Sequence, residues 1–227
     1  YTTWLKELDE KWLDRMISDD HLAIKLMELR TPTERKLLPE VVEAAFSVMN
    51  AMYTSEVVEP DVTTTQDLEW FMMQKVKDMG LDYWFEPTMD LQREGSDDSH
   101  ITGVIRRGDL LHCDFGIRYM NLCTDTQRLA YVAKEGEDAI PKDLANGMKV
   151  NNRFQDIVRS CMKAGKTGNE VLAEALAQAK EEGIEATLYS HPCNMYGHGP
   201  GPTIGLWHQQ SAIPAKGDVE LDNDTTY

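Results

Sequence analysis

The stretch that decides the fold is Gly108-Asp109-Leu110-Leu111-His112-Cys113-Asp114-Phe115-Gly116, which continues through Arg118-Tyr119-Met120-Asn121 to Cys123-Thr124-Asp125-Thr126. Apolar residues occupy every second position from Leu111 to Ile117, the period that is typical of a strand with one buried face. The polar, turn-tolerant residues 118–121 divide the stretch into two parts. It therefore predicts an antiparallel hairpin of two strands.

Two aspartates lie at equal distances along the chain from a turn centred between Tyr119 and Met120. In a hairpin with that turn, Asp114 and Asp125 face each other, with Cβ atoms about 5 Å apart. Two carboxylates so close on a half-buried face need a shared proton, a cationic side chain or a metal ion. A turn one residue elsewhere is the alternative, with one of the two carboxylates facing water.

The composition limits the classes of function. The 227 residues are 41% hydrophobic and 27% charged, which is ordinary for a globular protein, and the formal net charge is −16. Such an acidic chain is poorly suited to bind nucleic acid phosphates or an anionic membrane surface. No run approaches about 18 apolar residues, so we expect no membrane-spanning helix. The four cysteines form no CxxC pair, which argues against a disulfide framework or a zinc ribbon.

The start of the chain has two features. It begins at Tyr1 without a signal peptide, so we expect a processed or trimmed product. The compartment stays open between the cytoplasm and export of a soluble protein whose signal segment is absent from this sequence. Residues 1–30 predict an N-terminal helical segment, because apolar residues recur at helical spacing and form a packing face. That face comprises Trp4, Leu5, Leu8, Trp12, Leu13, Met16 and Ile17.

Local signals predict the following elements. Thr31-Pro32-Thr33-Glu34 is a capping box that opens a helix to Met52, bent near Pro39. Residues 90–103 are rich in polar residues and predict a loop. A further helix is expected from Pro141 to near Gly165.

Two segments of the chain have the same organisation. Residues 64–80 and 167–183 each predict a capped helix that begins at a threonine and ends in glycine, with a capping box at Thr167-Gly168-Asn169-Glu170. A short strand and a proline follow in both cases, as Glu86-Pro87 and His191-Pro192. This similarity indicates an internal repeat, although a helix followed by glycine and a strand is also a common unit.

Three of the six histidines, His191, His198 and His208, lie close together in a stretch rich in glycine and proline. Glycine on both sides of His198 leaves its imidazole accessible. A single histidine in such a turn is usually only a turn residue, but here the aspartate pair is also present. Two carboxylates and an imidazole are ligands that suit Mn²⁺, Fe²⁺, Co²⁺ or Zn²⁺.

These motifs resemble the pita-bread metallopeptidases, which include methionine aminopeptidase, aminopeptidase P and prolidase. The resemblance is carried by Asp114-Phe115-Gly116, by Thr124-Asp125-Thr126-Gln127-Arg128, and by Gly197-His198-Gly199 followed by Ile204-Gly205-Leu206. It covers residues 31–227 and suits the prolidase and aminopeptidase P branch. It implies an α+β fold in which two pseudo-symmetric helix–strand halves surround a curved antiparallel sheet.

The resemblance also implies roles for individual residues. Asp114, Asp125 and His198 would be metal ligands, and two glutamate ligands would follow beyond Tyr227, so that the C-terminal part of the domain is missing from this sequence. The other two histidines of the glycine-rich stretch occupy positions of catalytic residues that contact the substrate or the tetrahedral intermediate. They are His191 and His208, the latter displaced by an inserted stretch at Pro200-Gly201-Pro202. His112 shares the face of Asp114, and two alternatives stay open for it: a partner of the metal site, or the commoner case of a satisfied core histidine.

The function that the resemblance implies is that of a metal-dependent exopeptidase, an Xaa-Pro aminopeptidase or dipeptidase. Two divalent ions, of Mn, Co, Zn or Fe, would activate a bridging water for attack on the scissile carbonyl. The expected partner is a peptide or dipeptide substrate, with a homodimer as an open alternative to a monomer. Two other functions stay open on the same fold: a metal-free creatinase-like hydrolase and a non-catalytic peptide-binding module.

Overall fold

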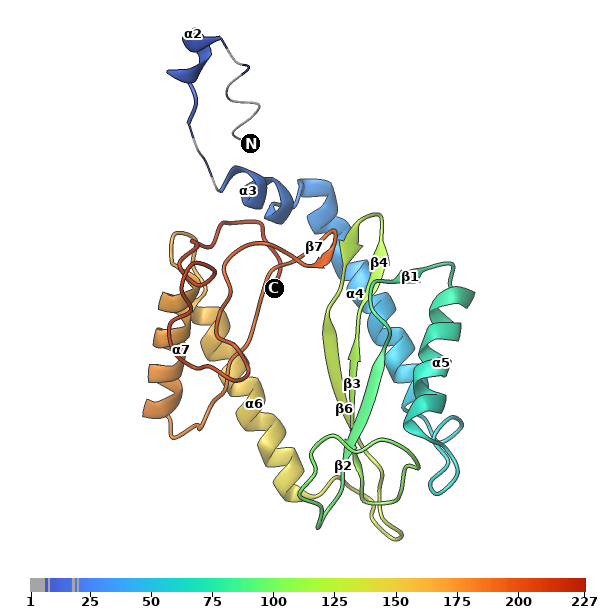
Figure 1. Ribbon diagram of the computed structural model, residues 1–227. Helices are drawn as coiled ribbons and strands as arrows, with labels where there is room; N and C mark the ends of the chain where they lie inside the picture. Colours follow the sequence, from blue (N-terminus) through green and yellow to red (C-terminus); the bar gives the residue numbers. More distant parts are fainter. Residues whose placement is uncertain (1–6, 8, 18, 20) are drawn as a thin grey trace.

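The computed structural model describes residue 7, residues 9–17, residue 19 and residues 21–227 (Figure 1). Two short helices, α2 (Glu10–Leu13) and α3 (Leu22–Glu28), form within the predicted N-terminal helical segment. The predicted packing face is wrong for its described members Trp12, Leu13, Met16 and Ile17, which are all exposed. Trp4, Leu5 and Leu8 of that face lie outside the described residues.

The longer helices begin where their caps predict. In α4 (Pro32–Met52), the N-cap side chain of Thr31 and the side chain of Glu34 form a reciprocal capping box. The same arrangement opens α5 (Thr65–Asp78) at Thr64 and α7 (Gly168–Glu181) at Thr167, whereas α6 (Lys142–Cys161) follows Pro141. No helix in the described part of the chain combines the length and the apolar character that a membrane crossing requires.

In the part of the chain that the structure describes, the strands form three small antiparallel sheets. One has the order β2 (Thr88–Gln92), β3 (Leu110–Phe115) and β6 (Thr126–Tyr131). The second has the order β1 (Asp82–Tyr83), β4 (Ile117–Tyr119) and β5 (Leu122–Cys123), and the third pairs β7 (Cys193–Asn194) with β8 (Gly197–His198). Figure 1 shows α5 on one side of the long strands and α6 and α7 on the other.

Among the described residues, two separate hydrophobic clusters stabilise the fold. The first packs α4 and α5 against β2 to β5, with Met49, Leu68 and Phe115 among its fully buried residues. The second packs α6 against α7 and includes Ile157 and Val171. Each cluster therefore belongs to one half of the chain.

The predicted register of the hairpin is wrong by one position of the turn. Met120 and Asn121 are the turn residues, with φ of 48° and 64°, and the ladder places Asp114 opposite Gln127. A two-residue hairpin turn favours positive φ at both central positions, and asparagine tolerates this conformation better than most residues. Since this shift moves each partner by two residues, Asp125 stays on the same face as Asp114.

The predicted loop at residues 90–103 is wrong at its start, because Asp90–Gln92 belong to β2. Asp90 pairs with His112 and Leu91 pairs with Leu111. The buried Met89 and Leu91 alternate with half-buried or exposed polar neighbours. Because most residues from Asp90 to Gly103 are polar, this short alternation was not recognised as a strand in the sequence.

Backbone bridges support the internal repeat. The N-cap residues Thr64 and Thr167 form antiparallel bridges to Val104 and Glu220, respectively. In each half a further bridge lies between these two residues along the chain, Leu91 to Ile101 in the first half and Ser190 to Ile204 in the second. Each half therefore returns its chain to the N-terminus of its own capped helix.

Candidate metal centre

Asp125, His191 and His198 come together between the two halves. The Oδ2 atom of Asp125 lies 3.4 Å from Nε2 of His191 and 3.5 Å from Nε2 of His198. One potential ligand atom from each residue lies within 4.8 Å of the other two. A carboxylate and two imidazoles at this spacing can hold a divalent cation.

Local backbone contacts position these side chains. Thr124 exchanges hydrogen bonds with Ile117, since its backbone N–H donates to the Ile117 carbonyl at 2.9 Å and its hydroxyl accepts from the Ile117 N–H at 3.1 Å. This holds the adjacent Asp125 where the chain leaves the β4–β5 hairpin. His198 lies on β8 and pairs with Cys193 on β7.

The tautomer of His191 is fixed by its neighbour. Its Nδ1 lies 3.0 Å from the carbonyl oxygen of Pro192, which can only accept a hydrogen bond. In the neutral ring, Nδ1 therefore carries the proton and Nε2 presents its lone pair towards Asp125. Burial and the neighbouring His191 lower the pKa of His198, which also favours the neutral, ligating form of that ring.

Asp114 is an incompletely satisfied carboxylate beside this group. Its Oδ1 atom is buried and has no hydrogen-bond partner within the described residues, and its Oδ2 atom accepts from Gln127 Nε2 at 3.4 Å. Burial and the charge of Asp125 raise the pKa of Asp114, and burial raises the pKa of Asp125. A buried carboxylate oxygen without a partner is costly, and a cation would offset that cost. The residues present therefore fit a metal ion.

Trp84 is a residue of the site that the sequence did not reveal. Its indole Nε1 donates to the carbonyl of Thr124 at 2.7 Å, and its ring centroid lies 5.2 Å from that of His198. A Cβ atom at Gly116 or Gly197 would lie 2.3 Å or 2.1 Å from Trp84. The glycines of both motifs thus make room for one indole, which joins the hairpin to the Gly-His-Gly turn. In the sequence, these two glycines were the available sign that a bulky side chain packs against both motifs.

Residues 36–226 match the model of metallopeptidase family M24. The chain belongs to this family. The predicted resemblance to the pita-bread metallopeptidases is therefore confirmed.

Two proteins are similar to this M24 chain in sequence. Each is named "Putative Xaa-Pro aminopeptidase". The one from Mycoplasma genitalium is 24% identical over 135 residues, which cover 57% of this chain and 37% of that protein. The one from Mycoplasma pneumoniae is 26% identical over 120 residues, which cover 52% of this chain and 33% of that protein. The match thus spans about a third of the length of these relatives.

Solved structures are similar to this M24 chain in fold. An X-Pro aminopeptidase from Thermotoga maritima has a TM-score of 0.63 at 17% identity, covering 96% of this chain and 61% of that one. A dipeptidase from Pyrococcus horikoshii has a TM-score of 0.67 at 17% identity, covering 96% and 60%. A methionine aminopeptidase from Rickettsia prowazekii has 0.59 at 12% identity, covering 88% and 79%. The predicted α+β class and pita-bread fold are confirmed.

His208 occupies a different environment from the other two histidines in this M24 chain. It lies in the turn between Leu206 and Gln209, which exchange backbone hydrogen bonds of 2.9 and 3.0 Å. Its ring is exposed and packs against Trp207, with centroids 4.9 Å apart. Within the described residues, no hydrogen bond or ion pair joins it to Asp114, Asp125 or His198, so its catalytic role stays a prediction.

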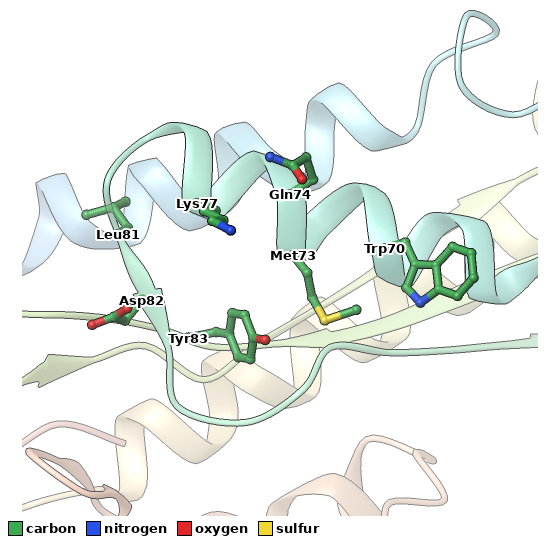
Figure 2. Close-up of a pocket in the computed structure, with 7 residues that line it drawn as sticks. All are labelled: Trp70, Met73, Gln74, Lys77, Leu81, Asp82 and Tyr83. Atoms are coloured by element: carbon green, nitrogen blue, oxygen red, sulfur yellow. The ribbon is translucent and has the colours of Figure 1, made fainter.

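Two surface cavities lie apart from the candidate centre. One, of about 580 Å³, lies between α5 and β1, where Trp70, Met73 and Tyr83 line it (Figure 2). The other, of about 650 Å³, lies between residues 92–99 and the start of α6. None of the described residues that line either cavity belongs to the Asp125 group.

Proposed function

We propose that the protein is a metal-dependent exopeptidase that cleaves next to proline, as an Xaa-Pro aminopeptidase or a dipeptidase. The observation that carries this proposal is the grouping of Asp125, His191 and His198 beside the unsatisfied carboxylate of Asp114. The names of its sequence relatives support the choice of substrate class.

Asp114, Asp125 and His198 would hold the cofactor, two divalent ions of Mn, Co, Zn or Fe. When bound, such ions lower the pKa of a coordinated water and polarise the scissile carbonyl. The paired carboxylates favour this reading over a metal-free hydrolase, because without a cation they repel each other.

His191 and His208 would transfer protons and contact the substrate. Since Nδ1 of His191 bonds to the Pro192 carbonyl, Nε2 is the atom that can accept or return a proton, or bind the cation. His208, on its exposed turn, is proposed to contact the peptide or the tetrahedral intermediate.

The test combines metal analysis with hydrolysis of Xaa-Pro dipeptides and longer Xaa-Pro peptides by the intact protein. Asp125→Asn should abolish both stoichiometric metal binding and hydrolysis. Asp82→Asn makes the same chemical change at an exposed position on β1 and should leave both unchanged. Hydrolysis without metal would favour the metal-free alternative. Metal binding without hydrolysis would favour a peptide-binding module.

A further inference from the structure

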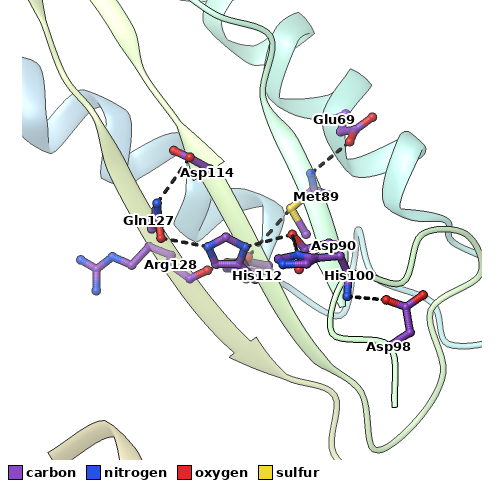
Figure 3. Close-up of polar contacts among 10 residues, drawn as sticks. Glu69, Met89, Asp90, Asp98, His100, His112, Asp114, Gln127 and Arg128 are labelled. Carbon is purple, nitrogen blue, oxygen red and sulfur yellow. Dashed lines mark hydrogen bonds and ion pairs between the residues drawn. The ribbon is translucent and has the colours of Figure 1, made fainter. Parts of the chain in front are cut away.

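A row of side-chain hydrogen bonds crosses the β2–β3–β6 sheet and ends on Asp114 (Figure 3). Asp90 Oδ2 on β2 lies 3.2 Å from Nδ1 of His112 on β3. The other ring nitrogen, Nε2, lies 3.0 Å from Oε1 of Gln127 on β6. Gln127 Nε2 then donates to Asp114 Oδ2 at 3.4 Å. Each of the three strands thus contributes to one connected row.

Both ends of this row are carboxylates, and this determines which group donates and which accepts in each hydrogen bond. An ionised carboxylate only accepts hydrogen bonds, so Gln127 must present its NH₂ group to Asp114. Its carbonyl oxygen then faces His112, whose Nε2–H donates to it. Asp90, also a carboxylate, accepts from Nδ1–H on the other side of the ring, so both ring nitrogens donate and His112 is an imidazolium in this row. A reversed amide would instead place the Gln127 carbonyl against the Asp114 carboxylate.

We propose that Asp90, His112 and Gln127 are positioning residues that orient the Asp114 carboxylate for a divalent cation; this rests on the proposed function. Gln127 is the hydrogen-bond partner of Oδ2, whereas Oδ1 has none among the described residues. The row therefore holds one oxygen of Asp114 and leaves the other for a cation. Outer groups that orient a metal ligand in this way commonly change metal affinity by about 10- to 100-fold.

The packing around the row indicates that these residues orient the Asp114 carboxylate rather than stabilise the fold. Gln127 is exposed, and its side-chain hydrogen bonds within the described chain go to His112 and Asp114. The adjoining β2–β3 pair is stabilised by the buried Met89 and Leu91 rather than by Asp90. Loss of the row should therefore leave folding intact while altering the carboxylate.

Two matched controls are available. Gln74 is an exposed glutamine on α5 that donates to Asp78 at 2.7 Å, away from the sheet. His100 approaches the same Asp90 oxygen at 3.2 Å, but its side chain is 75% exposed and it does not lie between Asp90 and Asp114.

The experiment is calorimetric titration of the intact protein with Mn²⁺, together with the visible absorption bands of the Co²⁺ form. Gln127→Met should weaken Mn²⁺ binding by about 10-fold or more and shift the Co²⁺ bands, with an unchanged melting temperature. Asp90→Asn should weaken binding in the same direction. Combined with Gln127→Met it should add nothing, because the row is already broken at its last member. Gln74→Met and His100→Gln should keep the wild-type affinity.

Wild-type affinity in Gln127→Met, or independent effects of the two substitutions, would overturn the inference. If the wild-type protein binds no Mn²⁺ or Co²⁺, the proposed function itself is overturned, so the two failures are distinguishable.

Discussion

Replacing Gly197 by alanine tests whether the Gly-His-Gly turn packs against the hairpin through Trp84. The backbone at Gly197 has φ of 79°, a conformation that costs an L-residue about 1–2 kcal/mol. The new Cβ would lie 2.1 Å from a ring atom of Trp84, so the indole has to move. Overpacking of this kind costs about 1–3 kcal/mol. We therefore expect the free energy of unfolding to fall by about 2–5 kcal/mol.

Gly80→Ala is the matched control for the backbone contribution. Gly80 has φ of 69°, and no atom lies within 4 Å of an added Cβ, so only about 1–2 kcal/mol should be lost. The assay is urea denaturation of both variants, followed by tryptophan fluorescence. Equal losses in the two variants would refute the reasoning, because the contact with Trp84 would then contribute nothing.

Three further substitutions test other parts of the structure. Burial and Asp222 raise the pKa of Glu28 from 4.5 to about 7, so the folded state binds this proton more tightly and stability falls as the pH rises between those values. In urea titrations Glu28→Gln should gain up to about 3 kcal/mol at about pH 8 and little at about pH 5; equal gains would contradict this. Thr167→Ala removes an N-cap and should cost about 1 kcal/mol in the same assay, so unchanged stability would count against the capping box. Trp84→Phe leaves the Thr124 carbonyl without its donor and should cost about 1–3 kcal/mol, and a smaller loss would argue against that bond.

The sequence predicted the helices well because their signals are local. A threonine at the N-cap and an acidic residue three positions later identify the starts of α4, α5 and α7 without knowledge of the rest of the chain. The alternation that includes Leu111 and Phe115 likewise predicted β3 and its buried face.

Features that depend on the backbone conformation of a turn or on distant residues could not be predicted in the same way. The hairpin register depends on the conformations of Met120 and Asn121, and a shift of one residue at the turn moves every pair by two. Trp84 contacts glycines far away in the sequence, so no local pattern reveals its role.

The candidate centre could be predicted from the sequence only in part. The sequence motifs predict Asp125 and His198 as ligands of one site, and in the structure Nε2 of His198 lies 3.5 Å from Oδ2 of Asp125. The proximity of His191 to Asp125 depends on how the two halves pack. The pairing of Asp90 with His112 depends on β2, a strand that the sequence did not predict.

The two hydrophobic clusters give the candidate centre a second consequence, for folding. Asp125 comes from the half that contains the first cluster, and His191 and His198 come from the half that contains the second. A cation bound by all three would act as a noncovalent crosslink between two separately packed cores. At 100 times its dissociation constant, a ligand specific for the folded state adds about 2.7 kcal/mol to stability. With the ion bound, the two halves would then unfold together in one transition. The same ion would serve both in hydrolysis and in the cooperativity of unfolding.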